Sequence, residues 1–179
     1  MGDKERMSAA DMWKVWMSSV GVGGGWIMNL PPTVTGQIPD HWAAPAIAFG
    51  KALKESFSKP KAVLLSENTS VECGPGAAPL ELPILDTVGE WNAVRSAENV
   101  YHDGQRVVTY AIEALVGTKW RNVTSRGETV GVGTVDMHHP NPGESTKAQK
   151  LRWRCIAAAG GAQAITLTTV DLYLATPPA

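Results

Sequence analysis

The sequence predicts a mainly β protein, in which an antiparallel β-sandwich follows a helix–strand–helix leader. Two observations favour the sandwich: beyond residue 60, short apolar or alternating segments recur between turn signals, and the chain holds 18 Gly and 12 Pro to form those turns. Before residue 60, apolar residues instead recur mainly at helical spacing. We therefore expect an α/β leader in residues 1–60 and a sandwich domain in residues 61–179.

The leader is expected to contain two helices and one short strand. Residues 8–20 are predicted to form a helix with Ser8 as its N-cap, and residues 40–57 a second one. Between them, residues 26–30 are almost continuously apolar, which is typical of a strand buried on both faces in a parallel sheet. A lone parallel strand leaves both edges unpaired, so another domain, another chain or the rest of this chain must flank it.

The sandwich strands are expected where apolar and polar residues alternate. Residues 151–157 alternate most clearly, with Arg152 and Arg154 between apolar neighbours. Gly117 ends one alternating segment, and the next is expected to pair back as a hairpin. The predicted strands are residues 62–66, 80–85, 106–115, 119–124, 151–157 and 165–174.

Composition excludes several classes of function. With 44% hydrophobic and 18% charged residues the chain is globular, and a net charge of −1 gives no basic excess to hold nucleic acid or an anionic membrane. The apolar stretch 20–30 is broken by glycines and is shorter than the roughly 20 residues of a membrane span. We expect neither nucleic acid nor membrane as a partner. No targeting signal assigns a compartment, so the localisation is unknown.

The two cysteines allow at most one disulfide bond. Cys155 falls on the apolar side of the strand predicted at residues 151–157, which favours a buried free thiol, and a bond to Cys73 is the alternative.

No catalytic residue, metal ligand or cofactor site is assigned from motifs. His138 and His139 follow Asp136, but neighbouring side chains on a strand point to opposite faces and a Pro-rich loop follows, so solvated histidines are expected. Neither a nucleophile elbow nor a phosphate-binding loop occurs, and no pair of carboxylates stands out.

Two of the seven tryptophans are candidates for binding carbohydrate. Trp91 is expected at a junction between a loop and a strand, and Trp120 just after a hairpin turn. An indole at the edge of a sandwich can stack on a sugar ring. Filling the core or packing between domains is the alternative role for the same residues, because indole rings bury a large area.

Both halves of the chain carry segments that together resemble the α-L-fucosidase family of glycoside hydrolases. In the leader these are residues 16–21 (WMSSVG), 24–32 (GGWIMNLPP) and 36–39 (GQIP). In the sandwich they are residues 90–92 (EWN), 104–108 (GQRVV), 110–113 (YAIE), Trp120, 129–131 (TVG) and 170–173 (VDLY). The segments stand in the family's order. The sequence departs from the family at residues 132–134 and in the loop 138–146.

The resemblance implies the C-terminal part of such an enzyme. The leader would be the last strand and helix of the catalytic barrel, and the sandwich a galactose-binding-like jelly roll. The family's catalytic and fucose-binding residues lie earlier in the barrel, and no stretch here matches them, so no activity is expected from this chain alone. Fucosidase activity would require a joined catalytic barrel.

The function expected from the resemblance is therefore a non-catalytic accessory or carbohydrate-binding-like domain. A free-standing interaction module and an independent lectin-like sugar binder are the alternatives. The expected partners are a carbohydrate, a catalytic barrel or partner chain bound at residues 8–58, and a second copy of the chain.

Overall fold

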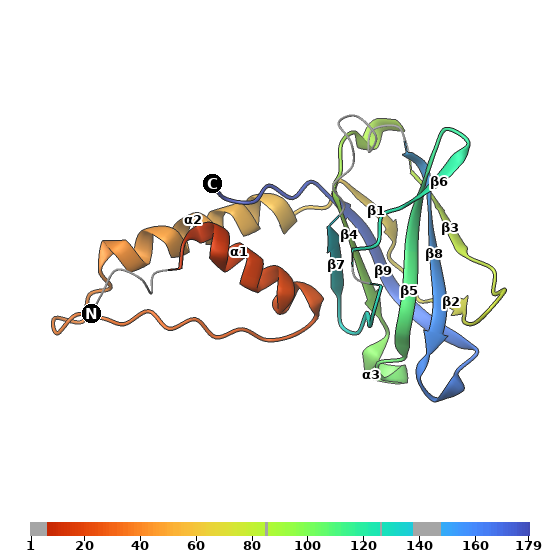
Figure 1. Cartoon of the computed structure of the whole chain (residues 1–179), viewed down its shortest axis with the longest axis horizontal. Coiled ribbons are helices and arrows are strands. Elements are labelled where there is room, and N and C mark those ends of the chain that lie inside the picture. Colours follow the sequence, from red (N-terminus) through yellow and green to blue (C-terminus); the bar gives the residue numbers. More distant parts are fainter. Residues whose placement is uncertain (1–6, 85, 126, 138–147) are drawn as a thin grey trace. The chain divides into compact units, whose positions relative to one another are not determined.

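The computed structural model describes residues 7–84, 86–125, 127–137 and 148–179. The chain divides into two compact units (Figure 1). The first runs to Lys59 and includes the C-terminal residues Ala175–Ala179, and the second is Pro60–Leu174. The backbone N–H of Thr176 donates to Ser56 Oγ at 2.9 Å, which joins the C-terminal residues to the first unit.

The helices of the first unit are α1 (Ala9–Ser18), α2 (Asp40–Phe57) and the short 3-10 turn η2 (Val20–Val22). Ser8 caps α1 as predicted, because its Oγ accepts the backbone N–H of Asp11 at 3.1 Å. None of the described helices is both long and apolar enough to cross a membrane.

Aromatic side chains join the two helices of this unit. The Phe57 ring stacks on Trp13 with 5.8 Å between centroids and on Trp16 with 5.2 Å. Trp13 is buried, whereas Trp16 is half-buried. The apolar spacing that predicted the two helices thus also supplies their contact.

The prediction of a strand at residues 26–30 is wrong. Residues 24–39 form no helix or strand, and Ile27 is 96% exposed. A strand requires the N–H and C=O groups of a neighbouring strand, and the first unit contains no other strand among its described residues. The apolar sequence therefore lies in an extended segment without a ladder of hydrogen bonds.

The second unit is a sandwich of two antiparallel sheets, which confirms the predicted fold class (Figure 1). One sheet has the order β1-β9-β4-β7, with β2 also paired to β9, and the other has the order β3-β8-β5-β6. Its described strands are β1 (Ala62–Leu65), β2 (Thr69–Glu72), β3 (Leu80–Pro83), β4 (Ala93–Glu98), β5 (Val107–Val116), β6 (Lys119–Asn122), β7 (Thr134–Met137), β8 (Ala148–Ala158) and β9 (Ala164–Tyr173). Strands β2, β4 and β7 were not predicted.

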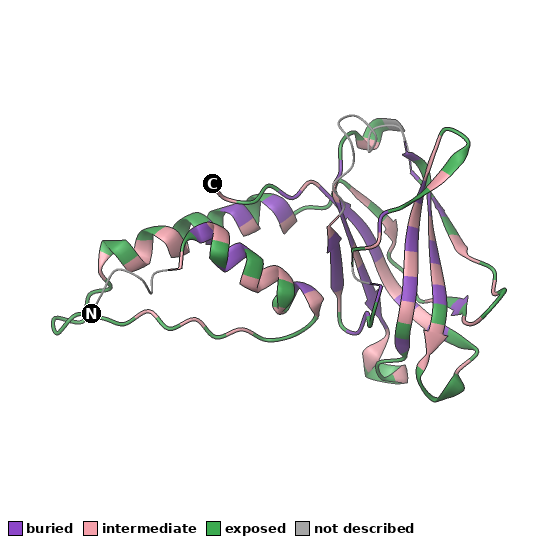
Figure 2. Cartoon of the chain, in the orientation of Figure 1, coloured by how far each residue is buried: buried purple, intermediate pink, exposed green. Residues whose placement is uncertain are grey.

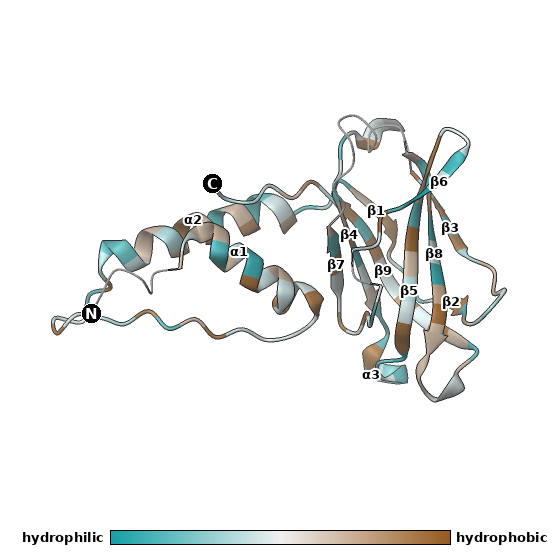
Figure 3. Cartoon of the chain, in the orientation of Figure 1, coloured by the Kyte–Doolittle hydropathy of each residue, from teal (hydrophilic) through white to brown (hydrophobic). Residues whose placement is uncertain are grey.

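The core of the sandwich lies between the sheets. Buried and less buried residues alternate along β5 and β8 (Figure 2), and hydropathy changes along them in a similar way (Figure 3). At its centre the rings of Tyr110 and Trp153 stack, with centroids 5.4 Å apart and planes within 7°. Leu167 on β9 is fully buried in the same cluster. Burial of side chains of this size contributes about 1.5–3 kcal/mol each.

The two cysteines form a disulfide bond, so the expectation of free thiols is wrong. Cys155 lies on the buried side of β8, as its strand pattern predicted, but Cys73 follows β2 and its Cα lies 4.6 Å from that of Cys155. The bond links the end of β2 in one sheet to β8 in the other, across a sequence separation of 82 residues.

Reduction of this bond should destabilise the sandwich strongly. Chain entropy for a loop of this length predicts a loss of about 4.5 kcal/mol in the free energy of unfolding. Urea denaturation with and without reductant, followed by near-ultraviolet circular dichroism, measures the loss. The double variant C73A/C155A serves as control, since reductant should leave its midpoint unchanged. Equal midpoints for the oxidised and reduced wild type would contradict the prediction.

Candidate functional site

The two tryptophans singled out by the sequence lie in different environments. Trp91 is 1% exposed and belongs to the hydrophobic core of the sandwich, so it fills the core and presents no ring at the surface. Trp120 lies on β6 and is half-buried. The structure does not bring the two side chains into one surface site.

One face of the Trp120 ring carries a cation. The guanidinium carbon of Arg152 lies 4.3 Å from the ring centroid, a cation–π contact. Arg152 also donates from Nε and Nη2 to the Glu113 carboxylate, at 2.6 and 3.0 Å. These hydrogen bonds hold the pKa of Glu113 below its ordinary value. Trp120 therefore offers a ligand only the ring face opposite the guanidinium.

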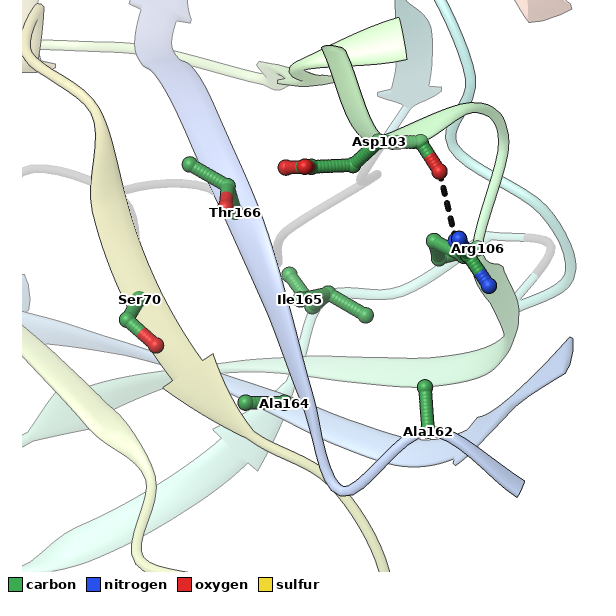
Figure 4. Close-up of a pocket in the computed structure, with 7 residues that line it drawn as sticks. All are labelled: Ser70, Asp103, Arg106, Ala162, Ala164, Ile165 and Thr166. Atoms are coloured by element: carbon green, nitrogen blue, oxygen red, sulfur yellow. Dashed lines mark hydrogen bonds between the residues drawn. The ribbon is translucent and has the colours of Figure 1, made fainter. Parts of the chain in front are cut away.

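A separate hollow of about 290 Å³ opens on the sandwich (Figure 4). Strands β2 and β9, the short helix α3 (Val100–Asp103) and the turns beside them form its walls. Its lining residues are Ser70, Asp103, Arg106, Ala162, Ala164, Ile165 and Thr166.

The register of β2 on β9 explains which side chains face the hollow. Val71 pairs with Ile165, and both are 3% exposed in the core. The preceding pair, Ser70 with Thr166, must therefore point to the outer face of the sheet, because side chains alternate along a strand. Two hydroxyl groups thus lie side by side at the floor of the hollow.

Asp103 and Arg106 supply the charged groups of the hollow. Arg106 Nε donates to the main-chain oxygen of Asp103 at 2.5 Å, and the Asp103 carboxylate extends toward β9 (Figure 4). Within the described part of the chain, neither the carboxylate of Asp103 nor the guanidinium of Arg106 forms an ion pair. A carboxylate and a guanidinium are therefore both available to a ligand.

The buried Glu98 holds the loop that carries Arg106. Its Oε2 accepts the backbone N–H groups of Arg106 and Val107 at 2.7 and 2.9 Å, and its Oε1 accepts that of Gly131 at 2.7 Å. The side chain is 6% exposed. A buried carboxylate is unfavourable unless hydrogen bonds replace its hydration, and these three donors do so for Glu98.

Asp136, which the sequence placed near a pair of histidines, is also committed to hydrogen bonds. It accepts from the Tyr110 hydroxyl at 2.6 Å and from the N–H and hydroxyl of Ser125, each at 2.9 Å. His138 and His139 lie outside the described residues. Among the residues that are described, no group of three or more His, Cys, Asp or Glu side chains could hold a metal ion.

Sequence patterns did not identify the hollow. Its residues are separated by up to about a hundred positions, and only the strand register and the turn at residues 103–106 bring them together. One signal was present: Arg106 belongs to the segment 104–108 on which the resemblance to fucosidases partly rests.

Comparison with known proteins gives matches among solved structures only. No family model matches the chain, and no curated protein matches it. A candidate α-L-fucosidase from Bacteroides ovatus superimposes with a TM-score of 0.80 at 21% identity, covering 96% of this chain and 27% of its own. The glycoside hydrolase family 29 fucosidase of Ruminococcus gnavus in complex with fucose gives 0.74 at 16% identity, covering 98% and 39%.

A glycoside hydrolase 29 family member from an unknown rumen bacterium gives the same TM-score of 0.74 at 19% identity, covering 98% of this chain and 31% of its own. The chain shares its fold with part of the α-L-fucosidases. This agrees with the resemblance seen in the sequence and extends it over nearly the whole chain. The chain spans between 27% and 41% of the length of the first fucosidase structures that it matches.

Replacing Glu98 by Gln should destabilise the sandwich by about 3 kcal/mol. The amide nitrogen would face a backbone N–H where the carboxylate accepts one, and hydrogen bonds to charged groups contribute about 1.5–3 kcal/mol each. Urea denaturation at neutral pH measures the change. Glu81→Gln is the matched control, because its ion pair with Lys150 is exposed and contributes at most about 1 kcal/mol. Equal losses in both variants would contradict the role of Glu98.

The Glu113–Arg152 pair should make stability depend on acid pH. Because the pKa of Glu113 in the folded protein lies below its ordinary value, the ion pair stabilises the fold at neutral pH, and this stabilisation is lost as the pH falls through the folded pKa. We expect Glu113→Gln to lower the free energy of unfolding by about 1–2 kcal/mol at pH 7 and by progressively less below about pH 4.5.

Denaturation of wild type and variant across this pH range measures the difference. Glu55→Gln is the control: it removes an exposed ion pair with Lys51 and should change the free energy of unfolding little at any pH. A cost of Glu113→Gln that stays constant down to strongly acid pH would contradict the assignment.

Proposed function

We propose that this chain is a non-catalytic accessory domain of an α-L-fucosidase-like glycoside hydrolase, with a sandwich of the galactose-binding-like jelly-roll class. The observation that carries the proposal is the extent of the shared fold. The likeness covers 96–98% of this chain but only 27–39% of the fucosidases of Bacteroides ovatus and Ruminococcus gnavus. The remainder of those proteins has no counterpart in this chain.

The leader supports the same proposal. Residues 24–39 form neither a helix nor a strand, and the apolar side chains of Ile27 and Val34 in this segment are almost fully exposed. Apolar residues on an unpaired segment indicate a surface that another structure covers. In our proposal this structure is a catalytic barrel, supplied by the same polypeptide or by a partner.

The exposed leader also favours a second candidate, a free-standing interaction module. There the same apolar residues would bind another protein or a second copy of the chain. Ile47 on α2 is also 70% exposed and is a further apolar side chain that a partner could cover. Size-exclusion chromatography separates the candidates in part, since self-association through the leader should give a dimer that an Ile27→Asp variant abolishes.

Under the accessory-domain proposal, the purified chain should not hydrolyse 4-nitrophenyl α-L-fucoside. The proposal assigns the nucleophile and the acid/base to a barrel that these residues do not form. Release of nitrophenol is followed at neutral and mildly acid pH, with a full-length fucosidase as positive control and boiled chain as background. Saturable hydrolysis above background, purified together with the chain, would contradict the proposal.

A further inference from the structure

We propose that the hollow between α3 and the β2–β9 pair binds a single sugar ring. The four polar side chains involved are Ser70, Asp103, Arg106 and Thr166. The choice of carbohydrate as ligand rests on the proposed function, whereas the location rests on the geometry of the hollow alone.

The charges of the hollow suit a neutral ligand with neighbouring hydroxyl groups. Asp103 offers only acceptor oxygens and the Arg106 guanidinium only donors. A sugar hydroxyl can donate to the carboxylate while its oxygen, or that of its neighbour, accepts from the guanidinium. An anion would meet the Asp103 carboxylate and a cation the Arg106 guanidinium, so a neutral polyol satisfies both groups best.

The hydroxyl groups extend this polar set at the floor. Ser70 and Thr166 are directly paired across β2 and β9 and lie on the same outer face. Each hydroxyl can donate or accept, so the pair adapts to either orientation of a ligand hydroxyl. Four polar groups from three separate segments thus surround one space (Figure 4).

The remaining wall is aliphatic. Ala162 and Ala164 line the hollow and carry no polar side-chain atoms, whereas Ile165 borders it with its side chain turned into the core. Ligand pockets commonly combine an apolar lining with a few oriented polar groups. A pyranose ring matches this arrangement, because its C–H groups can lie against the methyl groups while its hydroxyls reach the polar side.

The size of the hollow limits the ligand to about one ring. Its volume of about 290 Å³ lies just below the roughly 300–1,000 Å³ of small-molecule pockets. Because the hollow is open to solvent, further rings of an oligosaccharide would extend outward and contribute little to binding.

The site is largely formed before a ligand arrives. The backbone N–H of Arg106 is held by Glu98 at 2.7 Å, and its Nε by the main-chain oxygen of Asp103. Ser70 and Thr166 stand on paired strands. Side chains on fixed backbone lose less conformational entropy on binding, which allows measurable affinity from few contacts.

Titration of the whole chain with methyl glycosides of fucose, galactose and glucose tests the proposal. Chemical-shift changes in ¹H–¹⁵N spectra are followed up to about 50 mM, which covers millimolar dissociation constants. We expect saturable binding of at least one glycoside, with the largest shifts at residues 103–106 and 164–166. Asp103→Asn, which keeps the shape but loses the charge, and Arg106→Lys, which keeps the charge but loses the planar fork, should each weaken binding at least tenfold.

Controls separate this site from the surface around Trp120. Trp120→Ala should leave the dissociation constant unchanged, and near-ultraviolet circular dichroism should show each variant folded. Binding lost in Trp120→Ala but retained in Asp103→Asn would overturn the proposal. So would the absence of saturable binding by any of the three glycosides, or saturation by the zwitterion glycine in their place.

The result of the sugar titration is independent of the result of the fucoside hydrolysis assay, which tests the accessory-domain proposal. Hydrolysis of a fucoside by the chain would contradict the proposed function and leave the sugar titration unaffected. Absence of sugar binding would remove the assignment of the hollow, and the accessory role would still stand on the shared fold.

Discussion

The buried carboxylate of Glu98 is the interaction on which the arrangement of the sandwich loops depends. A carboxylate removed from water is unfavourable unless donors replace its hydration. Here three backbone N–H groups do so, two from the start of β5 and one from Gly131. Because the carboxylate can satisfy all three only in one geometry, it fixes two loops that are far apart in the sequence, and one of them carries Arg106.

Strand β2, which forms the opposite wall of the hollow, is also held in a fixed position. Strand β2 is short, and Val71 alone anchors it in the core through its side chain. The disulfide bond directly after it ties β2 to β8 in the other sheet. The outward-facing Ser70 therefore belongs to a strand held by its ladder on β9, by one core residue and by a covalent bond. Polar groups on such rigid elements keep their geometry better than groups on loops.

The sequence predicted those parts of the fold that follow from local periodicity. Strands β5 and β8 alternate between core and surface, as does the first half of β9, and both helices of the leader show helical spacing. Strand β4 was not predicted, because five of its six residues are buried and its sequence therefore does not alternate between apolar and polar residues.

The strand predicted at residues 26–30 was wrong for a related reason. The composition of these residues suits a buried strand, but a strand needs partner strands, which local sequence does not reveal. The disulfide bond and the hollow join residues that are tens of positions apart, and only the sheet register shows that they meet. Trp91 lies in the core, which was the alternative role weighed for it.

The residues that carry the resemblance to fucosidases serve mainly the fold. Val107 fills the core, and Gly131 has a φ of +55°, with Gln105 only 3.2 Å from the place that a Cβ would take. Both donate to Glu98. The groups that face the hollow, Arg106 apart, lie outside those segments. The segments that resemble fucosidases therefore include Arg106 and its support from Glu98, whereas Ser70, Asp103 and Thr166 lie outside them.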